Sequence, residues 1–191
     1  LVPKNDEFFG EYIPNYNDRL KFISNFSGSY GLALILKNKN YLFVDGRYTL
    51  QANNQCGRFF KIITIPNKMP SDIIKNNKIL VGFDPKLITK KSLSLFFSKC
   101  NCKFKPVKKN LIDKIWKRKV KINKKKFFKL PKNSVSETYS LKIKKVVENL
   151  RKNKVDYLFV TASENNAWML NIRGHDTEYT PIPHSYLLID K

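Results

Sequence analysis

Cysteine is scarce in this sequence of 191 residues, and its scarcity excludes two classes of protein. Cys56, Cys100 and Cys102 are too few and too irregularly spaced for the disulfide framework of a small secreted domain. One residue separates Cys100 from Cys102, whereas zinc-ligand pairs are usually separated by about two to four residues, and no histidine lies nearby. We therefore interpret all three as free thiols, buried or half-buried, in a reducing cytosol.

Long apolar runs are absent as well. No run approaches the roughly 20 residues that span a bilayer. The opening Leu1-Val2-Pro3 is followed at once by polar and charged residues, unlike a signal peptide. We therefore predict no membrane contact and a cytoplasmic location. Hydrophobic residues still make up 42% and aromatic residues 13%, which suffices for a packed core and argues against a disordered chain.

Acidic residues are few: 15 Asp and Glu stand against 37 Lys and Arg, for a formal net charge of +22. One interpretation is binding to nucleic acid or another anionic surface, because Lys and Arg neutralise phosphates. The other is compositional drift, since only 6 of the basic residues are Arg and 20 Asn accompany the lysines along the whole chain. Sites that read nucleic-acid sequence favour Arg for its bidentate geometry. We favour drift, and nucleic acid is not our expected partner.

The first part of the chain predicts hairpins mixed with β-α alternation. Asn17 or Asp18 can cap a first helix, and the small residues of 26–31 end it. Strands joined by a tight hairpin at 38–40 follow. This mixture predicts an α/β sandwich with a partly antiparallel sheet. The expected strands are 32–37, 41–45, 60–65, 79–83 and 103–107, with helices at 47–54, 70–76 and 89–99 and a helical turn at 111–116.

The character of the sequence changes at residue 117. Nine of the sixteen residues in 117–132 are Lys or Arg, without a sustained apolar period, which indicates a linker or a surface arm. A second module then opens with a long helix capped by Ser134 or Ser136. A buried strand at 157–161, a helix at 164–170 and a strand at 186–189 complete the expected elements. We therefore predict a first domain at 1–116, a basic linker at 117–133 and a second α/β domain at 134–191.

Both ends of the sequence suggest cuts through structure. The chain starts at Leu1, and Leu1-Val2-Pro3 reads as the end of a buried strand. The strand at 186–189 stops next to Lys191. We therefore expect a fragment, in which the first domain lacks its first helix and the second domain is truncated.

Three segments carry a resemblance to a known family. The first contains Asp6-Glu7, Glu11-Tyr12-Ile13-Pro14, Arg19, Phe26-Ser27-Gly28-Ser29-Tyr30-Gly31, Phe43-Val44-Asp45-Gly46-Arg47-Tyr48 and Gln51-Ala52. The second is Asn110-Leu111-Ile112-Asp113-Lys114-Ile115-Trp116, and the third is Ala167-Trp168-Met169-Leu170-Asn171-Ile172-Arg173-Gly174-His175-Asp176 with Thr180-Pro181-Ile182-Pro183. In order and spacing, over nearly all of the chain, they resemble the Xaa-Pro aminopeptidases of the creatinase and prolidase superfamily. Tyr30 and His175 depart from the pattern, which usually has a small residue and a serine there.

The resemblance implies a fold and an activity. The fold is α/β, with a mixed-sheet creatinase amino-terminal-type domain followed by the start of a second similar α/β domain. The implied parent is a homodimeric, three-domain metallopeptidase that removes the first residue of peptides with proline in second position. A carboxy-terminal domain would hold two Mn²⁺ through Asp, His and Glu. This chain has only His175 and His184 and no such ligand set, so we expect no catalytic or metal-binding residue in it and no activity from it alone.

Five residues are candidates for shaping the substrate entrance. Arg47 and Tyr48 follow a strand end, and the resemblance implies that they approach the active site of a partner subunit. The alternative for Arg47 is a buried salt bridge within its own domain. Arg173 and Asp176 flank a glycine and either face the cleft or pin their loop to neighbouring backbone, which is the interpretation we favour. His175 is a candidate surface hydrogen-bonding group.

Three functions remain in competition. The leading hypothesis is the non-catalytic part of a peptidase, which positions the catalytic domain, restricts the cleft to small peptides and supports dimer contacts. The second is a peptidase-like binding module whose basic run at 117–132 grips an acidic partner or nucleic acid. The third is a creatinase-like or dipeptidase relative with another substrate, which fits the fold but not the three-domain layout.

Overall fold

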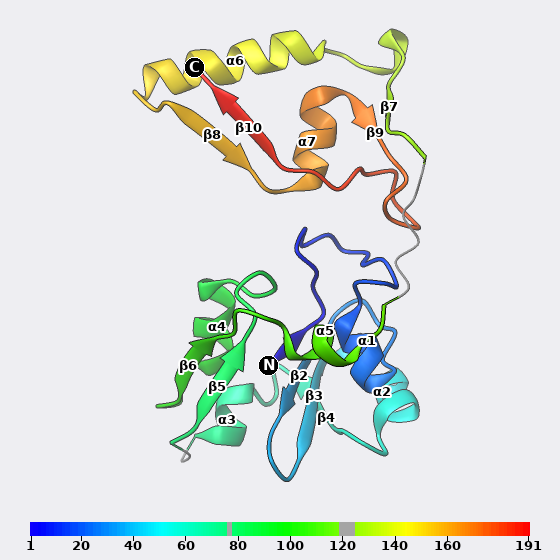
Figure 1. Ribbon diagram of the computed structural model, residues 1–191, viewed down its shortest axis with the longest axis vertical. Coiled ribbons are helices and arrows are strands. Elements are labelled where there is room, and N and C mark those ends of the chain that lie inside the picture. The colour runs from blue at the N-terminus through cyan, green and yellow to red at the C-terminus, as the bar shows by residue number, and fades with distance from the viewer. Residues whose placement is uncertain (76–77, 119–124) are drawn as a thin grey trace. The chain divides into compact units, whose positions relative to one another are not determined.

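The computed structural model describes residues 1–75, 78–118 and 125–191 (Figure 1). By their contacts the residues form two compact units. The first unit comprises Leu1–Glu7 and Asn15–Val120, and the second comprises Phe8–Pro14 and Lys121–Lys191. The short segment Phe8–Pro14 therefore packs with residues more than a hundred positions further along the chain.

The sheet of the first unit, within the described residues, consists of four strands: β1 (Val2–Pro3), β2 (Leu32–Ile35), β3 (Asn40–Asp45) and β4 (Lys61–Ile65). β1 and β3 flank β2 in antiparallel pairing, while β3 and β4 run parallel, so the sheet is mixed as the sequence predicts. The hairpin between β2 and β3 is tight, because Leu36 N donates to Lys39 O at 3.1 Å. The strand expected at the start of the chain is β1.

Helices cover this sheet and connect it to a separate parallel pair of strands. The elements are α1 (Arg19–Ser24), η1 (Gly46–Tyr48), α2 (Thr49–Cys56), α3 (Pro70–Ile74), β5 (Leu80–Phe83), α4 (Lys90–Phe97), β6 (Lys103–Pro106) and α5 (Leu111–Ile115). Of the two predicted caps of α1, Asp18 is the one used: its side chain accepts from Lys21 N at 3.0 Å. α1 ends at Asn25 in the left-handed conformation, with φ of 63°.

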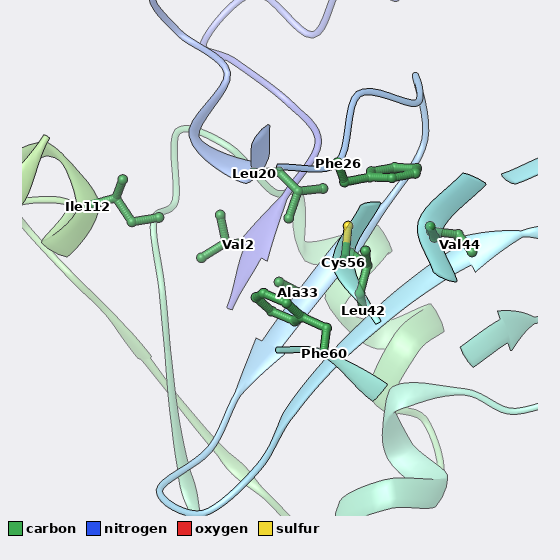
Figure 2. Packing of buried hydrophobic residues seen from close by; sticks show 10 residues of the cluster. Val2, Leu20, Phe26, Ala33, Leu42, Val44, Cys56, Phe60 and Ile112 are labelled. Atoms are coloured by element: carbon green, nitrogen blue, oxygen red, sulfur yellow. The ribbon is translucent and has the colours of Figure 1, made fainter. Parts of the chain in front are cut away.

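The four-stranded sheet is buried on both faces, and the side chains alternate between them as strand geometry requires. Leu42 and Val44 of β3 join one hydrophobic cluster, while Phe43 between them joins the other. Figure 2 shows the first cluster, to which α1 contributes Leu20 and α2 contributes Cys56. α3 and α4 cover the second face with Ile74, Leu93 and Phe97. Each fully buried large side chain contributes about 1.5–3 kcal/mol to folding.

The second unit contains two small antiparallel ribbons among its described residues. Its elements are β7 (Phe128–Lys129), η2 (Lys132–Ser134), α6 (Tyr139–Lys152), β8 (Tyr157–Val160), α7 (Ser163–Leu170), β9 (Ile172–Arg173) and β10 (Leu187–Asp190). β8 pairs with β10 and β7 with β9. β7 lies within the basic stretch 117–132, and residues 119–124 of that stretch lie outside the described residues.

Two predictions for this unit were wrong. The cap of α6 is Thr138, whose hydroxyl accepts from Leu141 N at 3.3 Å, and not Ser134 or Ser136. The sequence contains three closely spaced hydroxyl residues that fit a cap equally well. The strand at 157–161 is not buried either, because Phe159 is 59% exposed. β8 is part of a two-stranded ribbon, so no further strand of the described chain shields it.

Candidate functional site

The loop 26–31 is the centre of the motif residues in the first unit. Ser27 Oγ accepts hydrogen bonds from Gln51 Nε2 and Gln55 Nε2, each at 2.9 Å. Ser27 N donates to Gln55 Oε1 at 3.0 Å. Ser29 Oγ and the Tyr48 hydroxyl are hydrogen-bonded at 2.8 Å. Segments separated in the sequence thus hold one another in place through side chains of α2 and η1.

Gly28 is required in this loop by close packing of two aromatic rings. A Cβ at Gly28 would lie 2.4 Å from Phe26 Cζ and 2.8 Å from Tyr48 Cδ1. The two rings are edge to face, with centroids 5.8 Å apart, and Phe26 is completely buried. Tyr30 is 40% exposed, so the larger side chain found here is accommodated at the surface. Burial and the Asp45 carboxylate raise the pKa of Tyr30.

Arg47 and Tyr48 have different surroundings. The Arg47 side chain is 71% exposed and pairs with Asp45, its Nη2 lying 2.7 Å from Oδ2. The alternative of a buried salt bridge was therefore wrong in one respect: the pair forms within the domain, but at the surface, where β3 has just ended. The hydrogen bond from Arg47 lowers the pKa of Asp45. The Arg47 guanidinium also lies 5.2 Å from the Tyr48 ring centroid, while the Tyr48 hydroxyl is engaged by Ser29.

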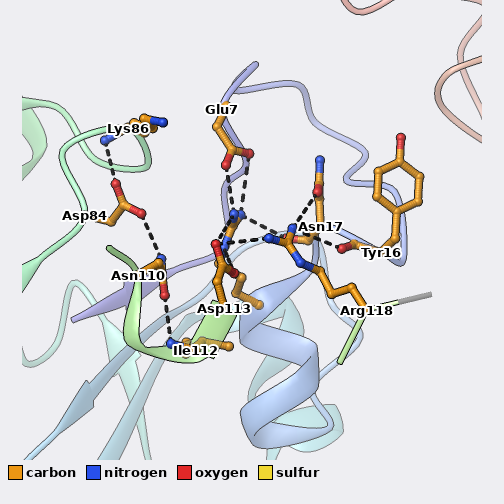
Figure 3. A network of polar contacts seen from close by, with 10 residues as sticks. Glu7, Tyr16, Asn17, Asp84, Lys86, Asn110, Ile112, Asp113 and Arg118 are labelled. Carbon is orange, nitrogen blue, oxygen red and sulfur yellow. Dashed lines mark hydrogen bonds and ion pairs between the residues drawn. The ribbon is translucent and has the colours of Figure 1, made fainter. Parts of the chain in front are cut away.

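A buried ionic network joins the first motif segment to the second (Figure 3). Arg19 is 2% exposed, and its Nε and Nη2 donate to Asp113 at 2.9 and 3.0 Å. Nη2 also donates to Glu7 at 2.8 Å. Arg118 Nη2 lies 3.0 Å from the same Asp113. Burial opposes the charge of Arg19, but its hydrogen bonds to Asp113 and Glu7 outweigh burial and raise its pKa. The network thus links α1 to α5 and to Glu7 in the N-terminal segment of the first unit.

The loop 174–184 in the second unit is closed by contacts to backbone. Arg173 Nη1 donates to Ile172 O at 2.8 Å, and Asp176 Oδ2 accepts from His184 N at 2.8 Å. Gly174 N donates to Pro181 O at 2.9 Å. Asp176 thus joins the two ends of the loop, while Arg173 contacts the backbone that precedes it.

His175 and Gly174 show how tightly the start of this loop is packed. The His175 ring lies 5.7 Å from the ring of Phe128 on β7. A Cβ at Gly174 would lie 2.7 Å from Pro183 Cβ, so the two ends of the loop approach as closely as they do because residue 174 has no side chain.

A cavity of about 160 Å³ lies beside this loop, and the sequence did not predict it. Phe8 stacks on His184 with ring centroids 4.2 Å apart, and the ring centroids of Tyr12 and Tyr179 are 5.2 Å apart. In the sequence, the signal that the segment Phe8–Pro14 contacts the loop 174–184 was that Glu11-Tyr12 and Thr180-Pro181-Ile182-Pro183 both belong to the family pattern. The cavity is lined by Phe8, Gly10, Glu11, Tyr12, Ser163, Glu164, Thr177, Thr180, Ile182 and His184.

The charged groups of this cavity are carboxylates from two elements. Glu11 comes from the segment Phe8–Pro14, and Glu164 comes from the first turn of α7. Aromatic side chains and hydroxyl groups form the remaining walls. The arrangement suits a small ligand group with a positive charge or hydrogen-bond donors. Sequence reasoning missed Glu11, Glu164 and His184 as neighbours, while Arg47 and Tyr48 belong to the other unit.

The residues that the structure describes do not form a metal centre. Across residues 1–75, 78–118 and 125–191, no group of three or more His, Cys, Asp or Glu side chains is placed to hold a metal ion. The resemblance implies two Mn²⁺ ions in another domain, and the described residues of this chain do not fit such ions.

None of the helices in the described ranges is both long enough and apolar enough to cross a membrane.

Comparison with known proteins defines the family. Residues 12–115 match the family described as Creatinase/Prolidase N-terminal domain, and residues 117–191 match a second family with the same description. The chain therefore belongs to the creatinase/prolidase N-terminal domain family, and both the resemblance and the predicted α/β fold class are confirmed.

Three relatives show the extent of the similarity. The probable Xaa-Pro aminopeptidase P of Coprinopsis cinerea is 31% identical over 99% of this chain and 32% of its own length. Xaa-Pro aminopeptidase 1 of Dictyostelium discoideum is 32% identical over 100% of this chain and 33% of its own. A crystal structure of the Caenorhabditis elegans X-prolyl aminopeptidase, described as a cytosolic enzyme with a di-nuclear active site, superposes with a TM-score of 0.89. That protein is 29% identical over 99% of this chain and 32% of its own. The chain thus spans about a third of these relatives.

Proposed function

We propose that this chain is the amino-terminal, non-catalytic part of a metal-dependent Xaa-Pro aminopeptidase. The observation that carries the proposal is the agreement of fold and motif order with such enzymes over essentially the whole chain. The parent enzyme would be a cytoplasmic homodimer that uses two Mn²⁺ in another domain. It would release the first residue of peptides whose second residue is proline.

The role proposed for this part is to shape the entrance to the active site and to support dimer contacts. The bond before proline lacks an N–H group, which ordinary peptidases use for recognition, so a dedicated pocket is needed. Arg47 and Tyr48 are proposed to shape the substrate pocket of a partner subunit, since the Arg47 guanidinium is exposed beside the Tyr48 ring. Arg173, His175 and Asp176 are proposed to order the loop 174–184, which would lie near the substrate entrance of the complete enzyme.

A division into domains is proposed along with this role. The first domain would comprise residues 1–116, the linker 117–133 and the second domain 134–191. The two family matches, at 12–115 and 117–191, support a boundary next to residue 116. The buried Arg19–Asp113 pair supports the inclusion of α5 in the first domain.

An activity assay tests the proposal. The 191-residue chain and the longest protein encoded by the same reading frame are assayed with Mn²⁺ on a peptide with proline in second position. A matched peptide with alanine there is the control. We expect release of the first residue by the longer protein from the proline peptide only, and none by the chain alone. A reading frame without two Asp, a His and two Glu beyond Lys191 would refute the proposal.

A further inference from the structure

A basic pocket lies at the opposite end of β3 from the motif Asp45-Gly46. It is formed by the β2–β3 turn, residues 36–40, and by the connection between α2 and β4, residues 57–61. Its volume is about 570 Å³, within the usual range of about 300–1,000 Å³ for ligand pockets. Neither the family motifs nor the proposed peptidase function involves these residues.

The charged residues that line this pocket all have the same sign. They are Lys37, Lys39, Arg58 and Lys61, and no acidic residue lines the pocket. None of the four forms an ion pair with another residue in the part of the chain that the structure describes. Four cations of one sign around one hollow raise the local positive potential, which attracts an anion.

An exposed aromatic ring accompanies these cations. Phe59 is 70% exposed, although Phe60 beside it is only 6% exposed and anchors the connection in the first hydrophobic cluster. The Arg58 guanidinium lies 5.6 Å from the Phe59 ring centroid. The connection turns at Gly57, where a Cβ would lie 2.6 Å from Asn53 O. The backbone thus holds an apolar ring outward at the rim of a basic pocket, which is the combination that binds unpaired bases and their phosphates.

We propose that this pocket binds single-stranded nucleic acid, with a base stacked on Phe59 and phosphates at Lys37, Lys39, Arg58 and Lys61. Double-stranded nucleic acid offers no free base face to Phe59, and an acidic peptide or polyphosphate has no base at all. The ring therefore favours the single strand. The proposal is independent of the proposed peptidase function, and either can fail without the other.

The test compares two variants of the full chain that lose the same charge. K37Q/K39Q/R58Q/K61Q removes the four pocket cations, and K90Q/K91Q/K99Q/K103Q removes four exposed lysines of the same unit. Binding of a fluorescein-labelled oligouridine of about 12 nucleotides is measured by anisotropy at several salt concentrations. We expect the pocket variant to bind about tenfold or more weakly, with a log–log salt slope smaller by about 3, and the control to change less than about twofold.

A second pair of variants tests the class of ligand. F59A removes the ring, and L50A removes an apolar side chain that is 75% exposed on the preceding helix. We expect F59A to weaken binding about fivefold or more and L50A to leave it unchanged. If both four-charge variants lost the same affinity for oligouridine, the pocket would be overturned as the binding site, because affinity would then follow net charge alone. Unchanged binding by F59A, or equal competition by polyphosphate, would overturn nucleic acid as the ligand. All substituted side chains are exposed, and far-UV circular dichroism verifies folding.

Discussion

The sequence Tyr-Leu-Phe-Val occurs twice in the chain, at residues 41–44 within β3 and as β8 (Tyr157–Val160). In β3 Phe43 is completely buried, whereas the equivalent Phe159 is 59% exposed. β3 has a strand on each side and helices over both faces, while β8 has one partner, β10, in the described chain. The same four residues therefore form a strand in both units, but the neighbouring elements decide that β3 belongs to a hydrophobic core and β8 does not.

The largest difference is expected when the two equivalent phenylalanines are truncated. F43A should lower the free energy of unfolding of the first unit by about 3–5 kcal/mol, because it leaves a cavity in a packed cluster. F159A should change the second unit by less than about 0.5 kcal/mol, because its ring is largely in solvent. Each unit has its own tryptophan, Trp116 or Trp168, so urea unfolding is followed by fluorescence with the other tryptophan replaced by phenylalanine. A large loss for F159A would mean that another chain covers β8 in solution.

The ionic network offers the next comparison, between a buried and an exposed arginine. R19M should lower the stability of the first unit by about 3–5 kcal/mol, because Asp113 and Glu7 lose their buried partner. R47M, which removes the exposed partner of Asp45, should change stability by less than about 1 kcal/mol. The same Trp116 fluorescence measures both. Equal effects of the two substitutions would show that burial of Arg19 adds nothing to its pairing.

A buried lysine tests whether buried contacts stabilise the second unit although the strand β8 is exposed. Lys142 Nζ donates to Trp168 O and to Asn171 Oδ1, both at 2.7 Å, and lies 4.0 Å from the Trp168 ring centroid. K142M should lower the stability of this unit by about 1–3 kcal/mol, because the acceptors at the end of α7 lose their donor. Trp168 fluorescence measures it. K145M, at an exposed position of the same helix, is the control and should be nearly neutral.

Near neutral pH the smallest change in stability is expected at the Cys100–Cys102 pair, because its contribution varies only in alkali. Burial, followed by the hydrogen bond and the charge of Cys100, raises the pKa of Cys102 to about 12. Its contribution to stability is therefore complete below the unfolded pKa of about 8.5 and is lost as pH rises toward about 12. At a pH near 8.5, iodoacetamide should label Cys102 more than about tenfold more slowly in the folded chain than in urea. Peptide mass spectrometry measures the rates, and equal rates would contradict the raised pKa.

Much of the first unit could be predicted because its signals are local. Asp18 precedes an apolar helical period, and the hairpin residues 38–40 separate two runs of strand-forming residues. The family pattern identified the segments that meet at Ser27 and at Arg19. It did not reveal that Arg19 and Asp113 are partners in a buried network, since 94 positions separate them.

The second unit was predicted less well because its outcomes depend on contacts between distant residues. Thr138, Ser134 and Ser136 are equivalent as caps until the path of the chain into α6 is known. Nothing local places Phe8 on His184 or Glu11 beside the loop 174–184. In the first unit the exposure of Arg47 was also missed: its partner Asp45 is local, but whether the pair is buried depends on what packs over the end of β3.

The sequence by itself determined the element types, the family and the scarcity of metal ligands, because composition, periodicity and motif order are properties of neighbouring residues. Only the tertiary structure decided which of two identical strands is buried, which partners the motif residues contact and where cavities form. Burial and cavities arise from what packs against an element, and those partners come from positions that no local pattern connects.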